Sequence, residues 1–356
     1  MDVYEIRIEG LSYLYNYKEH TATVKWSQYN RSVRNLTIPS TFSYNGIEVK
    51  VEGIDEFSFR KCQHLKSVHI SEGITKISSH AFSFCPNLEE VIIPSTITFI
   101  DNWAFAYNQS LKNIHIPSNV KYIDPTAFVS CPNMRISVDS ANPYYDSRNN
   151  CNAVIETATN TLYFANQNTH IPCSIVAIGE HAFNDCQHIK EISIPEGIKS
   201  LHFFAFSGEN SSLKSITIPK SIEKVESPFA YNSSLKTIYW NATYCRESVY
   251  TTFIKHYAFE GCGATSFVFG SEVEHIPDSL CKNMKKLKNV IISPSVITIG
   301  DDAFSGCDNL KYALVPQHLL SRAKEVFGLN TGVRAYSTNG VDYETLLKTE
   351  KQNGHI

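Results

Sequence analysis

The sequence predicts a mainly β fold with short turns, an elongated and curved solenoid of about ten coils with a cap at each end. Three observations predict it. A phenylalanine recurs every 23 residues, a short strand pattern that ends at proline precedes it, and cysteine or asparagine follows it at a constant distance. Self-similarity at a fixed period is typical of repeat proteins, in which each coil packs only on its neighbours. The 356 residues can therefore form one continuous solenoid rather than several globular domains.

The recurring phenylalanines set the phase of the repeat, and we call them the anchors. They are Phe59, Phe82, Phe105, Phe128, Phe183, Phe206, Phe229, Phe259 and Phe304. Cys281 takes the anchor position before the last of them, and most anchors follow an alanine. We expect the anchor rings to stack from coil to coil inside the solenoid. Truncating one to alanine should then cost about 3–5 kcal/mol.

The strand segment of each unit alternates apolar and polar residues before a proline, as in IHIPSNV at 114–120. Alternation with period two turns the two apolar side chains of I-x-I into the core and leaves the middle residue facing solvent. Proline has no N–H to donate, so it ends the strand. The middle residues are therefore expected to form one exposed row. They are Thr37, His69, Ile92, His115, Ser193, Thr217, Tyr239, Val268, Ile291 and Leu314.

This exposed row is the expected binding face, because repeat proteins bind ligands on such extended surfaces. Several of its members are apolar or aromatic, and a contiguous exposed apolar patch marks an interface. The candidate binding residues are His69, Ile92, His115, Tyr239 and Ile291. The ordinary preference of strands for β-branched and aromatic residues explains the same pattern without a ligand, and the sequence leaves both explanations open.

The whole unit reads L-x-x-I-x-I-P-x-x-I-x-x-I-x-x-x-A-F-x-x-C over about residues 33–316. This pattern resembles the BspA-like, or Treponema-type, leucine-rich repeat. Residues 142–172 resemble the irregular element that interrupts such arrays in Bacteroidetes proteins. The resemblance implies a leucine-rich-repeat solenoid and a secreted or cell-surface protein that binds host proteins, such as extracellular matrix, or other cells. It does not imply a particular ligand.

The repeat phase and its interruptions divide one continuous solenoid into five segments. They are an N-terminal β cap at 1–32, repeats at 33–135, an interrupting loop and β-hairpin at 136–172, repeats at 173–316 and a C-terminal helical cap at 317–356. The hairpin is expected where AVIE and TLYFA flank TATN. In the cap, helical apolar spacing runs over 316–328 and ends at Gly328, and a final short helix is expected over 341–352.

Ten cysteines raise the question of a disulfide framework. Six of them, Cys62, Cys85, Cys131, Cys186, Cys262 and Cys307, lie three residues after an anchor, and Asn108 and Asn232 take the same slot. A slot shared by cysteine and asparagine predicts a buried, reduced side chain that meets backbone groups. A disulfide between neighbouring coils is the alternative, because their spacing is near the ~5.5 Å that a disulfide needs. Cys151, Cys173 and Cys245 lie outside this phase.

A second periodic feature is a basic residue near the start of most strands. The series is Lys66, Lys112, Lys190, Lys214, Lys236, Lys288 and Lys311. Stacked coils would place them in a row along one edge. A solvated edge that keeps the sheet soluble is one explanation, and an acidic partner or anionic glycan is the other.

No sequence motif of an enzyme, a P-loop or an EF-hand occurs, so a non-catalytic binding scaffold without a cofactor is expected. Two Cys-Gln-His triplets, at 62–64 and 186–188, lie too far apart in the array to share a metal, and Asn87 fills the histidine slot elsewhere. The oxygens of 142–152 favour a hydrogen-bonded loop over a calcium site. An enzymatic activity in 136–172 is a remote alternative.

Charge and hydropathy narrow the function classes further. A net charge of -3 argues against nucleic-acid binding, and no apolar stretch is long enough for a membrane helix. A monomer is expected. The first residues, MDVYEIRIEG, lack the pattern of a signal peptide. The protein is therefore expected to be secreted or at the cell surface with its leader absent from this chain, or else to be an intracellular, cytoplasmic scaffold, which reduced cysteines would favour.

Overall fold

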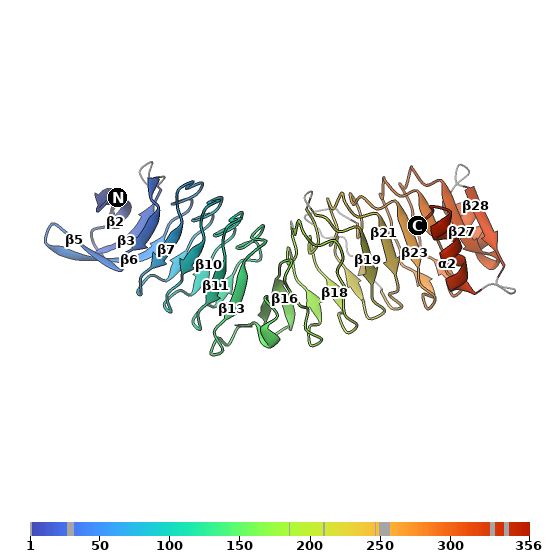
Figure 1. The fold of residues 1–356 in the computed structure, drawn as a ribbon, viewed down its shortest axis with the longest axis horizontal. Coiled ribbons are helices and arrows are strands. Elements are labelled where there is room, and N and C mark those ends of the chain that lie inside the picture. The colour runs from blue at the N-terminus through green and yellow to red at the C-terminus, as the bar shows by residue number, and fades with distance from the viewer. Residues whose placement is uncertain are drawn as a thin grey trace. The chain divides into compact units, whose positions relative to one another are not determined.

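The computed structural model describes residues 2–26, 32–184, 186–208, 211–245, 247–248, 257–327, 332–337 and 342–356. They fall into two compact units, Met1–Pro172 and Cys173–Ile356. We call these the first and the second unit. In each, successive strands follow one another in chain order along the unit (Figure 1). No helix among the described residues is both long and apolar enough to cross a membrane.

The first unit contains a parallel sheet that carries the predicted strand segments. Its strands are β4 (Asn35–Ile38), β7 (Ser67–Ile70), β9 (Glu90–Ile92), β11 (Asn113–Ile116) and β13 (Arg135–Val138). In β7, Val68 and Ile70 are buried and His69 between them is exposed. The register pairs His69 with Thr37 on one side and with Ile92 on the other. The predicted row of middle residues therefore exists in this unit.

A second sheet of the first unit joins the N-terminal segment to a ladder of short strands. Its members are β1 (Val3–Ile8), β2 (Leu11–Asn16), β3 (Thr21–Lys25), β5 (Thr41–Tyr44), β6 (Ile47–Ile54), β8 (Lys76–Ile77), β10 (Phe99–Ile100) and β12 (Tyr122–Ile123). β1, β2 and β3 form an antiparallel meander, and β3 then pairs in parallel with β6. Tyr13 and Val24 of the meander are buried in the common core.

The segment after β13 forms the β-structure that interrupts the repeats. β14 (Tyr145–Asp146), β15 (Val154–Glu156) and β16 (Thr161–Phe164) pair antiparallel, and the short helix η2 (Arg148–Asn150) follows β14. Asn142 is buried, and its Nδ2 donates to the carbonyls of Pro117 and Val120 at 2.8 and 3.1 Å. The polar side chains of this loop thus bind the preceding coil.

The second unit repeats the alternation of long and short strands, with the short strands β24 and β26 in a separate two-stranded sheet. Its longer strands are β19 (Ser215–Ile218), β21 (Thr237–Trp240), β23 (Ser266–Phe269), β25 (Asn289–Ile291), β27 (Tyr312–Pro316) and β28 (Gly332–Tyr336). Its short strands are β17 (Ala177–Ile178), β18 (Ser200–Leu201), β20 (Lys224–Val225), β22 (Glu247–Ser248), β24 (His275–Ile276) and β26 (Thr298–Ile299). Every pairing among these strands that involves neighbouring coils is parallel, as in β21 with β23.

The C-terminal segment forms helices in the two places where the sequence pattern indicates them, and also one strand that the pattern did not indicate. η3 (Gln317–Leu319) and α1 (Leu320–Phe327) follow β27 directly, β28 then extends the sheet, and α2 (Tyr343–Gln352) ends the chain. The expected helix end at Gly328 lies outside the described residues. Asp342 caps α2 by accepting from the N–H groups of Glu344 and Thr345. α2 packs back onto the sheet (Figure 1).

The anchor rings stack as expected. Phe59, Phe82, Phe105 and Phe128 are buried, with centroids 5.2, 5.4 and 5.6 Å apart and interplanar angles of 7° or less. Phe183, Phe206, Phe229 and Phe259 repeat the stack in the second unit. With about 12 turns formed by the described residues, the predicted mainly β solenoid is confirmed, and the expected number of about ten coils roughly matches.

The anchor segment is also held by a backbone ladder. The anchor N–H donates to the carbonyl of the alanine one coil further on, as in Phe59 to Ala81 at 2.7 Å. The residues two before and two after an anchor often have positive φ, as at His80 (φ 55) and Phe84 (φ 58). These bends aim alternate N–H groups along the solenoid axis. The buried alanine leaves room for the close approach of the next coil.

The structure also explains the slot three residues after the anchor. The Cys85 thiol donates to the carbonyl of Phe59, the anchor of the preceding coil, at 3.1 Å. Asn108 makes the equivalent bond through Nδ2 to Phe82 at 3.0 Å. Burial raises the pKa of the Cys131 thiol to about 12, so this thiol stays protonated and able to donate at neutral pH. None of the ten cysteines forms a disulfide in the structure, and only Cys173 is exposed.

Candidate binding faces

The outward face of the long-strand sheet in the first unit is open. His69 and His115 are exposed and Ile92, on the strand between theirs, has 48% of its surface exposed. Among the described residues, no element of the first unit covers these side chains. Neighbouring strands lie about 4.8 Å apart, so the two imidazoles are separated by roughly twice that distance. We call this surface, with Thr37 and Ser137 at its ends, the open strand face.

Charged and polar groups border the open strand face. His115 Nδ1 lies 3.0 Å from the Ser137 hydroxyl, and its Nε2 is 4.0 Å from Asp139. At the strand starts, the Glu89 carboxylate contacts Lys112 and lies 4.0 Å from Lys66. Hydrogen bonding and charge from Lys112 lower the pKa of Glu89. The open face is therefore a small apolar centre with a polar rim, which is the composition typical of an interaction surface.

The same row in the second unit is covered, and this corrects part of the predicted site. Ile291, a candidate binding residue, is 1% exposed, and its neighbours Val268 and Leu314 are 2% and 5% exposed. They form a cluster with Tyr343 of α2, which packs across β23, β25 and β27. The Tyr343 hydroxyl donates to the Phe269 carbonyl at 2.6 Å. The apolar residues of this row therefore bind the chain's own helix, and Ile291 is not available to a ligand.

Tyr239 lies at the edge of the area that α2 covers. It is half-buried against the same cluster, and burial raises the pKa of its phenol. A cavity of about 370 Å³ opens beside it, bounded by the first turn of α2 and by strand residues such as Thr217 and Val268. Tyr239 is thus a partly accessible residue at the rim of the covered area, while Ser193 and Thr217 of the same row are exposed.

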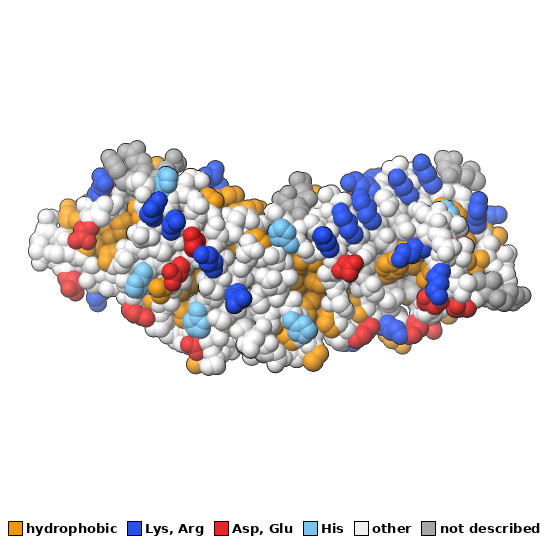
Figure 2. Space-filling view, viewed as in Figure 1, with side chains coloured by type: hydrophobic (Ala, Val, Ile, Leu, Met, Phe, Trp, Pro, Cys, Tyr) orange, Lys and Arg blue, Asp and Glu red, His pale blue; other side chains and the backbone are white. Residues whose placement is uncertain are grey.

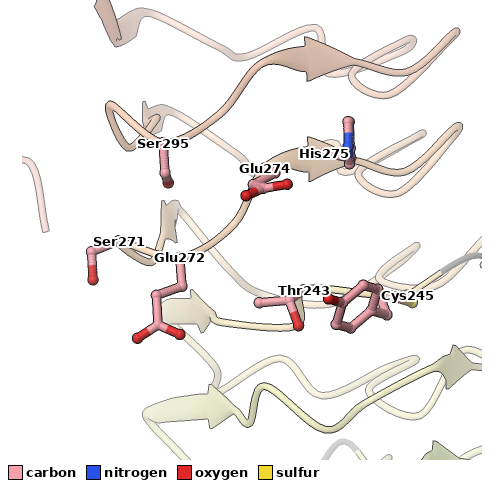
Figure 3. A pocket seen from close by; sticks show the side chains of 8 residues that line it. Thr243, Cys245, Ser271, Glu272, Glu274, His275 and Ser295 are labelled. Carbon is pink, nitrogen blue, oxygen red and sulfur yellow. The ribbon is translucent and has the colours of Figure 1, made fainter.

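A larger hollow of about 740 Å³ lies between the turns of neighbouring coils in the second unit (Figure 3). Its polar side chains include Glu272, Glu274 and His275, but they do not converge on one point (Figure 3). Glu272 pairs with Lys220, and His275 Nδ1 lies 2.8 Å from the Thr298 hydroxyl. In the described part of the chain, no group of three or more His, Cys, Asp or Glu side chains could hold a metal.

In other coils, the position equivalent to His64 and His188 holds a polar side chain that forms a hydrogen bond between coils. Asn87 Nδ2 donates to the Gln63 carbonyl of the preceding coil at 2.7 Å, and Asn309 donates to Lys285 at 2.6 Å. Serine makes the same kind of bond at position 212, to the carbonyl of Gln187. The slot therefore selects small polar side chains that link coils.

One constellation that the sequence did not reveal has the order of a catalytic relay. The Ser200 hydroxyl lies 3.2 Å from His202 Nε2, and His202 Nδ1 lies 2.6 Å from the buried Glu226. Burial alone would raise the pKa of Glu226, but hydrogen bonds from His202 and Lys224 outweigh it and lower the pKa. Such a relay also needs N–H groups aimed at a substrate oxygen. The N–H groups of Ser200 and His202 instead bind the preceding coil, so the constellation links neighbouring coils.

The strand starts of the second unit carry a row of lysines, whereas in the corresponding row of the first unit the acidic Glu89 stands between Lys66 and Lys112. Lys214, Lys236, Lys288 and Lys311 are exposed and each precedes a long strand. Figure 2 shows Lys and Arg side chains in a row along one edge of the second unit, whereas basic and acidic side chains alternate on the first. In water, neighbouring charges at strand spacing repel by about 1 kcal/mol.

A comparison with models of known protein families identifies the family of this chain. The model for the BspA type leucine rich repeat region, in six copies, matches residues 27–149, 160–252 and 252–340. The chain belongs to the BspA-type leucine-rich-repeat family. This family assignment agrees with the coils, anchors and parallel ladders described above. Among curated proteins, none matches this BspA-type repeat protein in sequence.

Solved structures show the same fold. The pneumococcal vaccine antigen PcpA is similar with a TM-score of 0.55 and 16% identity, over 94% of this chain and 98% of that one. A leucine-rich repeat protein from Eubacterium ventriosum has a TM-score of 0.50 and 18% identity, over 84% of this chain and 93% of that one. At sequence identities of 16% and 18%, the similarity shows a shared fold and gives no information about a ligand.

Proposed function

We propose that this BspA-type protein is a non-catalytic binding scaffold, secreted or at the cell surface, that holds a protein or glycan ligand on the open strand face of the first unit. The observation that carries the proposal is the exposure of His69, Ile92 and His115 in three consecutive coils. The corresponding apolar row of the second unit is covered by α2. A row that stays uncovered on a rigid sheet is free to meet a partner.

The chemistry of the open strand face suits a mixed apolar and polar contact. Ile92 offers a side chain that a partner can desolvate, and the imidazoles of His69 and His115 can each donate and accept hydrogen bonds. The ion pairs of Glu89 set a polar rim beside them. Small apolar centres with a polar rim carry most of the affinity in many interfaces. An extracellular matrix protein is the partner class that the family resemblance supports for an adhesion role.

Binding to immobilised matrix proteins, mucins and neutral glycans tests the proposal. We expect the triple variant His69→Ala, Ile92→Ser and His115→Ala to bind at least tenfold more weakly. The residues that dominate an interface each contribute about 1 kcal/mol or more to the binding free energy. Ser193→Ala with Thr217→Ala is the matched control, since both residues are exposed on the same row of the second unit. Equal binding by both variants, each folded by circular dichroism, would contradict the proposal.

An intracellular scaffold is the second candidate, and one observation favours it. Ten cysteines without a disulfide, nine of them buried, are the cysteine usage expected in a reducing compartment. Fractionation of cells that express the native gene distinguishes the two. Protein found only in the cytoplasm, protected from protease added to intact cells, would favour the intracellular scaffold.

A further inference from the structure

The rows of basic residues at the strand starts differ between the two units. In the first unit the row runs Arg34, Lys66, Glu89, Lys112 and Arg135, and the central carboxylate pairs with both lysines. In the second unit the same place holds five lysines and a threonine. They are Lys190, Lys214, Lys236, Thr265, Lys288 and Lys311. The first row therefore has a carboxylate at its centre that pairs with two of its basic residues, whereas the described positions of the second row hold no acidic residue.

The backbone fixes the spacing of the second row, which we call the lysine row. Each residue donates its N–H to the carbonyl of the preceding one, as in Lys236 to Lys214 at 2.8 Å and Lys311 to Lys288 at 2.9 Å. Successive residues are therefore one strand spacing apart, about 4.8 Å. All five lysines are exposed, and within the described ranges none has an ion pair or side-chain hydrogen bond. The nearby Asp308 is taken by Lys285 at 2.6 Å.

We propose that the lysine row binds a linear anionic polysaccharide, one that carries sulfate or carboxylate groups along its chain. The proposal concerns a different surface from the open strand face and does not rest on the proposed function. A straight row of regularly spaced charges matches a polymer whose charges also repeat along a line. Lysine ammonium groups act as mobile point charges that do not demand the paired geometry of an arginine contact, so they suit sulfates and carboxylates spaced along a flexible chain.

The surroundings of the row favour a saccharide over the other polyanions. Single-stranded nucleic acid is held by aromatic side chains beside the basic groove as well as by charge. Among the residues that directly follow the row positions one is aromatic, Tyr312, and its half-buried ring is stacked on His355. The net charge of -3 gives the chain as a whole no attraction for polyanions. Attraction is therefore local to the row, and a partner must lie along it to gain several contacts at once.

The experiment measures the affinity of the full chain for heparin, polygalacturonate and neutral dextran, by titration at low and moderate salt. The sulfated and carboxylated probes separate the two anion types. We expect binding to at least one of them, none to dextran, and an affinity that falls steeply with salt. The triple variant Lys214→Gln, Lys236→Gln and Lys288→Gln should bind about a hundredfold more weakly, since each lysine near an anionic surface accounts for about fivefold. Lys66→Gln, Lys112→Gln and Lys121→Gln removes the same charge from the first unit and is the matched control.

Two further variants change the residue at the centre of each row toward its counterpart in the other row. Thr265→Glu places a carboxylate at the centre of the lysine row, as Glu89 does in the first unit, and should weaken binding without removing a lysine. Glu89→Thr should create weak binding on the first unit that survives the triple change in the second. Equal affinity of wild type and the Lys214, Lys236, Lys288 variant would overturn the proposal. So would tighter binding to polyglutamate or single-stranded DNA of matched charge than to either polysaccharide.

Discussion

Replacing Asn108 tests whether the slot after the anchor is defined by its hydrogen bonds or only by its volume. Asn108 is fully buried, and its Nδ2 donates to the carbonyls of Phe82 and Phe105 at 3.0 and 2.8 Å. Its Oδ1 accepts from the Cys85 N–H at 2.8 Å. At about 1 kcal/mol for each bond, Asn108→Ala should destabilise the first unit by about 3 kcal/mol.

The Asn108→Cys variant supplies the comparison, because cysteine occurs naturally in this slot. The Cys131 thiol donates to the Phe105 carbonyl at 3.2 Å, so a thiol at position 108 should restore the equivalent bond to Phe82. We expect this variant to lose about 1–2 kcal/mol, less than the alanine variant. Asn108→Leu keeps the volume but leaves the Cys85 N–H without a partner, so it should lose about as much as alanine or more.

Urea unfolding followed by tryptophan fluorescence measures these differences. A Trp240→Phe background leaves the signal to Trp26 and Trp103, both in the first unit. Trp103 stacks on Tyr107 at 5.3 Å, next to the substituted slot. Equal midpoints for the alanine and cysteine variants would show that the thiol donor contributes nothing. A leucine variant as stable as wild type would show that the slot requires only volume, and either result would refute the reasoning.

Four other predictions follow from single features of the structure. Phe105→Ala should lower the free energy of unfolding by about 3–5 kcal/mol. Phe59→Ala should lower it by about 0.5–1.5 kcal/mol less, because Phe105 stacks on two anchor rings and Phe59 on one among the described anchors. Urea unfolding of both variants measures the difference. Tyr343→Ala should release α2, seen as faster hydrogen exchange at 266–269, whereas Tyr343→Phe loses only the hydroxyl bond, about 1 kcal/mol. The pKa of Glu226 lies below its ordinary 4.5, so the charged carboxylate stabilises the fold above that pH and this contribution is lost as the pH falls. The difference in free energy of unfolding between wild type and Glu226→Gln, measured by urea unfolding, should therefore shrink from about pH 6 to about pH 3. A thiol reagent should label one cysteine rapidly in the native protein, Cys173, and ten after denaturation.

The coil interior was predictable from the sequence because each interior position has one physical task repeated in every coil. The anchor spacing gave the ring stack, and the alternation in IHIP gave the buried and exposed sides of β11. The equivalence of Cys85 and Asn108 gave a shared hydrogen-bond slot. The left-handed residues on either side of the anchor were not predictable. Phe84 is a residue type that seldom adopts a positive φ, and only the backbone ladder of the anchor segment requires it there.

The candidate site was predictable only in part, because outward positions have no common task. His69, Ile92 and His115 are exposed as expected, and Ile291 is not. Long-range packing by α2 decides the difference, and this contact joins residues far apart in the chain. The relay of Ser200, His202 and Glu226 was missed for a related reason. Its members come from neighbouring coils, and only the parallel register brings them together.

The outward row did carry a signal that separates a covered from an open face. Val268, Ile291 and Leu314 are apolar in three consecutive coils, whereas Ile92 stands alone between two histidines. Three adjacent apolar side chains on a sheet form a patch that water disfavours strongly enough to require a permanent cover. A single isoleucine with polar neighbours can stay exposed. A run of apolar outward residues next to a C-terminal amphipathic segment therefore indicates that the chain covers its own face, and an interrupted run indicates a face left for a partner.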